Sequence, residues 1–93
     1  MSTRPGNGRL TIRDLWLAAL RSLNLQLNRS TFDNWVKGTK ALFYADGVLT
    51  VQAKHLMARD ILIKNDWLGD AMTRLAGKPI QIRVVLAGEE VGR

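Results

Sequence analysis

Few side chains in this chain are of the kinds that carry out catalysis. It holds one histidine, His55, and no cysteine, so a nucleophilic or metal site would have to be built around His55. Neither a glycine-rich nucleophile elbow nor a phosphate-binding P-loop accompanies it. Asp60, Asp66 and Asp70 occupy polar positions of a helical stretch and are expected to face water. The sequence therefore predicts no enzyme activity, no metal, no cofactor and no small-molecule substrate.

Positive charge is the second chemical property of the chain. Its 14 basic and 8 acidic side chains give a formal net charge of +6, which favours contact with nucleic acid or with acidic protein surfaces. No two basic residues are adjacent in sequence, so a merely solvated basic surface is the simpler interpretation. If a single strand of nucleic acid binds, the side chains that we expect to contact it are Arg13, Arg21, Lys54 and Arg59.

The length of 93 residues suits one domain. We expect a flexible arm over residues 1–10, a folded domain over residues 11–86 and a polar tail over residues 87–93. No apolar run approaches the roughly 20 residues that a membrane helix needs, and the polar, basic start lacks the apolar segment of a signal peptide. The expectation is a cytoplasmic protein that does not enter a membrane.

Residues 15–35 organise the folded part. Thr11 and Asp14 have the spacing of a capping box and predict a helix start. Apolar residues then recur at helical spacing and form one face. Beside this face lies an apolar shoulder, which neighbouring elements could cover or which could meet another protein. The shoulder is formed by Trp16, Leu17 and Leu20.

The elements after the first helix follow from turn and capping residues. Ser30 is the expected N-cap of a short helix over residues 31–37, whose inner face carries Phe32 and Trp35. Asp46-Gly47 predicts a hairpin turn between strands at 39–45 and 48–53. A helical stretch over 54–76 breaks its register around residues 63–66, and a last strand covers 80–86.

The expected fold class is α+β, in the order α-α-β-β-α-β, with a three-stranded sheet that carries the helices on one face. The other face would be wet. Phe43 and Tyr44 point to opposite faces, so at most one aromatic ring is available there for stacking on a base. The element order is similar to that of KH-type RNA-binding domains, although no GxxG loop follows a helix.

Several short motifs, in order, resemble the N-terminal domain of the DnaA family of bacterial replication initiators. The resemblance covers roughly residues 15–86, and the order and spacing of the motifs carry it rather than any one of them. The motifs are Leu15-Trp16, Ser30-Thr31-Phe32 with Trp35, Thr39-Lys40-Ala41-Leu42, Asp46-Gly47 with Leu49 and Val51, Ala58-Arg59-Asp60 with Leu62, and the stretch from Leu75 to Arg83.

The resemblance implies a KH-like module without catalysis. It implies that the module docks the replicative helicase and initiation regulators, self-associates weakly and touches single-stranded DNA weakly. The family's self-association tryptophan falls on Trp16, and its docking positions fall on Thr31 and Met57, with His55 just before Met57. Thr31 replaces an acidic residue and Met57 a phenylalanine, so the partner or its affinity is expected to differ.

Two other functions remain open from the sequence. One is a KH-like domain that binds single-stranded nucleic acid, and the other is a stand-alone homodimeric adaptor that uses the Trp16 shoulder. Met57 and Trp16 could also be plain core residues, because apolar stripes on helices are usually buried. His55 could be only a surface or helix-capping residue.

Overall fold

A capping box starts the first helix, α1 (Ile12–Gln26), as predicted. The Thr11 hydroxyl accepts a hydrogen bond from the Asp14 N–H at 3.0 Å, and the Asp14 carboxylate accepts one from the Thr11 N–H at 3.2 Å. The structure is a computed structural model that describes residues 11–87. The expected arm over residues 1–10, and the expected tail from residue 88 onward, lie outside the described residues.

The second helical segment is built differently from the prediction. A short turn, α2 (Arg29–Thr31), runs directly into a π-helical turn, η2 (Phe32–Val36). Ser30 does not cap it; the cap is Asn28, whose side-chain oxygen accepts a hydrogen bond from the Thr31 N–H at 2.8 Å. The helix therefore begins two residues earlier than expected, because an amide oxygen three residues before a free N–H satisfies that donor.

Three strands form one mixed sheet in the order β1-β2-β3. The strands β1 (Lys40–Ala45) and β2 (Val48–Ala53) are antiparallel, and their turn is the predicted one. Asp46 and Gly47 have φ values of 52° and 78°, and a type I′ hairpin turn requires a positive φ at both of its central positions. The third strand, β3 (Gln81–Leu86), pairs parallel to β2.

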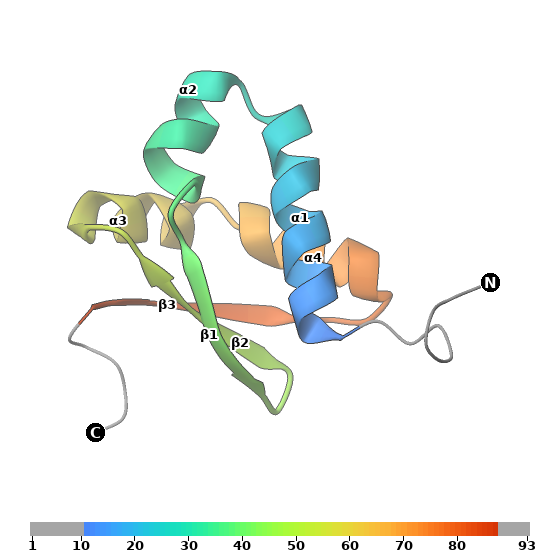
Figure 1. Ribbon diagram of the computed structural model, residues 1–93. Helices are drawn as coiled ribbons and strands as arrows, with labels where there is room; N and C mark the ends of the chain where they lie inside the picture. Colours follow the sequence, from blue (N-terminus) through green and yellow to red (C-terminus); the bar gives the residue numbers. More distant parts are fainter. Residues whose placement is uncertain (1–10, 88–93) are drawn as a thin grey trace.

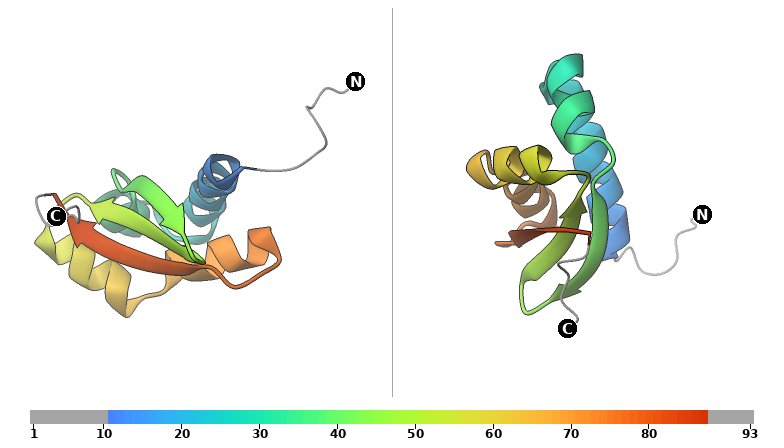
Figure 2. Two further views of the ribbon diagram at one scale, coloured as in Figure 1. Left: turned by 90° about the horizontal axis from the view of Figure 1, so that it is seen from below. Right: turned by 90° about the vertical axis from the view of Figure 1, so that its left-hand side faces the viewer.

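The parallel pairing of β2 with β3 requires a crossover, which two helices supply. These are α3 (Leu56–Lys64) and α4 (Trp67–Ala76), separated at Asn65 and Asp66, where the sequence predicted a break. Gly77 ends α4 in the left-handed conformation, with φ 73°. In Figure 1 and in both views of Figure 2, α3 and α4 lie along β3, whereas α1 lies beside β1.

The core is an apolar cluster between the helices and one face of the sheet. Three side chains of β2 with the same facing, Leu49, Val51 and Ala53, meet side chains from α1, α3 and α4. The α+β class and the order α-α-β-β-α-β are thus confirmed. The opposite face is less wet than expected: Thr50 is buried there, because it sits on the central strand between its pairing partners Phe43 and Arg83.

Two leucines of α1 test this assignment of the core. Leu23 is 2% exposed and Leu25 is 83% exposed on the same helix. We expect Leu23→Ala to lower the free energy of unfolding by about 2–5 kcal/mol, through lost burial and the cavity left behind. Leu25→Ala should change it by less than about 0.5 kcal/mol. Urea denaturation followed by circular dichroism measures both; equal losses would contradict the packing described.

Candidate functional site

A hydrogen bond and a ring contact hold η2 against the start of α3. The Lys54 ammonium donates to the backbone carbonyl oxygen of Asp33 at 2.7 Å. The Trp35 and His55 rings meet edge to face, with centroids 6.2 Å apart and planes at 79°. Of the predicted docking residues, Thr31 ends α2 directly before η2, while His55 caps α3 and Met57 lies in its first turn. We call Thr31, His55 and Met57 together the η2–α3 surface.

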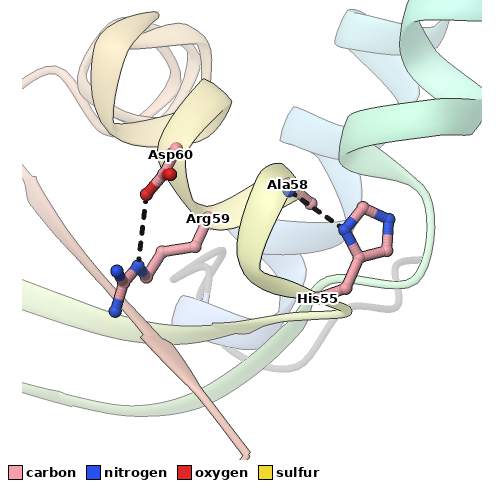
Figure 3. Close-up of polar contacts among 4 residues, drawn as sticks. All are labelled: His55, Ala58, Arg59 and Asp60. Atoms are coloured by element: carbon pink, nitrogen blue, oxygen red, sulfur yellow. Dashed lines mark hydrogen bonds and ion pairs between the residues drawn. The ribbon is translucent and has the colours of Figure 1, made fainter.

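His55 has a definite structural role at this surface. Its Nδ1 atom accepts a hydrogen bond from the Ala58 N–H at 3.1 Å, which caps the N-terminus of α3 (Figure 3). The helix-capping interpretation of His55 is therefore what the structure shows. The cap requires an Nδ1 that carries no proton, since only an unprotonated ring nitrogen accepts. The imidazole is exposed, so capping and contact with a partner are compatible.

Met57 is not a core residue. Its side chain is 60% exposed on the first turn of α3, while Thr31 is half-buried at the junction of α2 and η2. Leu56 and Ile63 are also exposed on α3, and neither was predicted from the sequence as a surface residue. A signal existed: both lie outside the face that Ala58 and Leu62 bury, so the period of the helix places them toward solvent.

The Trp16 shoulder is mostly closed. Trp16 is 6% exposed and belongs to the core, and Leu20 is half-buried against it. Only Leu17, at 46% exposure, presents a large apolar side chain to solvent. Contact between copies of the chain at this shoulder would therefore be made by Leu17, while the Trp16 side chain stays buried in the core.

The four basic residues named for nucleic acid are not gathered into one patch. Arg13 and Arg21 are exposed on α1 and two helical turns apart. Lys54 is engaged with Asp33, and Arg59 lies beside Asp60 with 3.6 Å between Nε and Oδ1 (Figure 3). Two of the four are thus committed to contacts within the chain.

Two general features complete the description of residues 11–87. Within this range, no group of three or more histidine or carboxylate side chains is arranged to hold a metal ion. None of the helices in the same range is both long and apolar enough to cross a membrane.

Comparison with known proteins agrees with the resemblance read from the motifs. The chain is 30% identical over 83 residues to the chromosomal replication initiator protein DnaA of Synechocystis sp. (strain ATCC 27184 / PCC 6803 / Kazusa). The match covers 87% of this chain but 19% of that relative, so the chain spans about a fifth of its length. The resemblance to DnaA is thereby confirmed. No family model matches the chain.

Replacing His55 tests whether its cap stabilises α3. His55→Ala removes the acceptor of the Ala58 N–H, so we expect the free energy of unfolding to fall by about 1 kcal/mol. Asparagine is a good N-cap, so His55→Asn should recover most of the loss while omitting the ring contact with Trp35. Chemical denaturation of both variants checks this. If His55→Asn lowers the free energy of unfolding as much as His55→Ala does, the Trp35 contact rather than the cap is the stabilising interaction.

Proposed function

Because 87% of this chain is similar to part of DnaA, we propose that the chain is a non-catalytic protein-interaction module of bacterial DNA replication initiation. In this proposal it docks the replicative helicase and initiation regulators through the η2–α3 surface. It also associates weakly with other copies through α1. The observation that carries the proposal is the exposed Met57 side chain, set on a helix start that His55 caps.

The geometry suits a docking point that is formed before the partner arrives. The Lys54–Asp33 hydrogen bond and the Trp35–His55 contact fix the end of η2 relative to the first turn of α3. A partner therefore need not order this part of the backbone on binding, which lowers the entropy cost of association. The exposed side chains are few, so the interface is small and the expected affinity is on the order of micromolar.

The helicase contact is tested on two exposed apolar residues of α3. Met57→Ala should weaken binding of the chain to the cognate replicative helicase about fivefold or more, since a central apolar contact is typically worth over about 1 kcal/mol. Ile63→Ala is the matched control, because Ile63 is 61% exposed and Met57 60% exposed on the same helix. Isothermal titration calorimetry measures both affinities.

The second docking residue is tested in the same assay. Thr31→Glu restores the charge that the resemblance implies at this position, so it should change the helicase affinity in either direction by a measurable factor. If neither Met57→Ala nor Thr31→Glu alters binding, the η2–α3 surface is not the helicase contact. If only Ile63→Ala lowers the helicase affinity, the helicase contact lies at the C-terminal half of α3.

Self-association is tested at Leu17 rather than at Trp16, because Trp16→Ala would also remove a core side chain. Leu17→Glu places a charge in the exposed part of the shoulder. It should raise the dissociation constant for self-association at least about tenfold, so that more of the chain is monomeric. Leu25→Glu, at the other end of the same exposed helix surface, is the control. Analytical ultracentrifugation over a concentration series gives both constants. Unchanged self-association of Leu17→Glu would contradict the α1 contact.

A further inference from the structure

A groove of about 540 Å³ lies between the first half of α1 and the strand β1. Apolar side chains from α1, β1 and β2 form most of its lining: Ile12, Trp16, Leu17, Leu42, Phe43 and Leu49. Leu42 and Phe43 are exposed, as is Leu17. We call this the α1–β1 groove; it is of the size of an ordinary ligand site, and it shares no residue with the η2–α3 surface.

The charges around the α1–β1 groove have one sign. Among residues 11–87, Arg13 from α1 and Lys40 from β1 are its charged lining residues, and no acidic side chain of that range lines it. Both are exposed, and neither makes an ion pair with another residue in the described range 11–87. An apolar floor with a basic rim is complementary to a ligand that combines apolar and acidic groups.

One polar group in the lining also lacks a partner. Thr39 is 7% exposed, and its hydroxyl is buried without a hydrogen bond to any residue of the described part of the chain. A buried hydroxyl left unpaired costs about 1–3 kcal/mol. An acceptor on a bound molecule, such as a peptide carbonyl, would satisfy this donor. The groove thus holds a hydrogen-bonding group in addition to its apolar surface.

The wall opposite α1 is a sheet edge. In the described part of the chain β1 pairs only with β2, so one side of its backbone has no neighbouring strand from residues 11–87. A peptide in extended conformation can add to such an edge through main-chain hydrogen bonds, with alternate side chains entering the adjoining groove. Extended geometry also separates the two kinds of side chain, because successive residues point to opposite sides.

From these features we propose that the α1–β1 groove binds an extended segment of a partner protein in which apolar and acidic residues alternate. Its apolar side chains pack over Trp16 and Leu17, its carboxylates pair with Arg13 and Lys40, and a main-chain carbonyl accepts from Thr39. This function is separate from docking at the η2–α3 surface. A single strand of nucleic acid fits less well, because the described residues that line the groove include only two cations and one exposed aromatic, Phe43.

The direct test is a titration of the full ¹⁵N-labelled chain with a capped eight-residue peptide of alternating leucine and glutamate. It is run at a concentration at which sedimentation shows a monomer. We expect the amide signals of residues 12–17 and 39–43 to shift. The same peptide with lysine in place of glutamate should not shift them, because its charge repels Arg13 and Lys40. No shift with the glutamate peptide at millimolar concentration would overturn the proposal.

Two charge-reversal variants separate local pairing from the overall field of the chain. The double variant Arg13→Glu with Lys40→Glu should bind the glutamate peptide at least about tenfold more weakly than the original chain does. The double variant Lys64→Glu with Lys78→Glu changes the net charge by the same amount at exposed residues outside the groove. Its affinity for the glutamate peptide should fall no more than about threefold. Equal weakening by the two variants would mean that the field alone attracts the peptide, and the groove assignment would fail.

Thr39→Val gives a readout that a purely structural role would not produce. It removes the unpaired hydroxyl at nearly constant volume, so the free chain should be as stable as before or more stable. Peptide affinity should nevertheless fall about fivefold, for the loss of one hydrogen bond of about 1 kcal/mol. A destabilised chain with unchanged peptide affinity would refute the role of Thr39 in binding.

Two other occupants are distinguished in the same titration. If an oligomer of eight thymidylates shifts the groove signals at lower concentration than the glutamate peptide, the groove is a nucleic-acid site and the proposal is wrong. The chain's own Glu89 and Glu90 are a second source of acidic groups. If Glu89→Gln with Glu90→Gln shifts the groove signals in the absence of peptide, the groove is filled from within the protein rather than by a partner.

Discussion

The burial of β2 between two neighbours of opposite direction is the constraint on which the rest of the structure depends. Leu49, Val51 and Ala53 place one face of this strand in the core. Its antiparallel neighbour needs only the turn at Asp46 and Gly47, whereas its parallel neighbour can be reached only by a crossover. The crossover begins at once, with α3 starting at Leu56. That immediate start places His55 against Trp35 of η2, with Met57 two residues further along the chain, so the proposed docking surface follows from how the sheet is paired.

Most of the fold could be predicted because its signals are local. The capping box at Thr11, the hairpin turn at Asp46-Gly47 and the left-handed Gly77 each need only a few adjacent residues to act. The second helix was predicted less well. Ser30 and Asn28 are both good caps, and only the geometry of the chain leaving α1 decides that Asn28 is used. Nothing in the sequence predicted the π-helical turn that follows it, since its i→i+5 bond has no residue preference of its own.

The surfaces were harder to predict than the elements because exposure depends on what a neighbouring element covers. Helical period placed Trp16 and Leu17 on one shoulder, yet packing closes the first and leaves the second open. The same period left both burial and exposure open for Met57, and the start of α3 leaves it exposed. The α1–β1 groove joins residues more than twenty positions apart in sequence, such as Trp16 and Leu42. No pattern within either segment reports on their distance, so this feature required the structure.

The register of β1 against β2 shifts between Ala41 and Phe43, which leaves Leu42 without a pairing partner. Such a bulge interrupts the even spacing of backbone donors and acceptors along the outer edge of the sheet. The strands of other copies could pair with an unbroken edge one after another, and this repeated pairing leads to fibrous aggregates. With the bulge in its middle and the charged Lys40 at its start, this edge suits one short added strand but does not favour continuous polymerisation. A small domain can in this way keep a sheet edge open to solvent and still remain dispersed at high concentration.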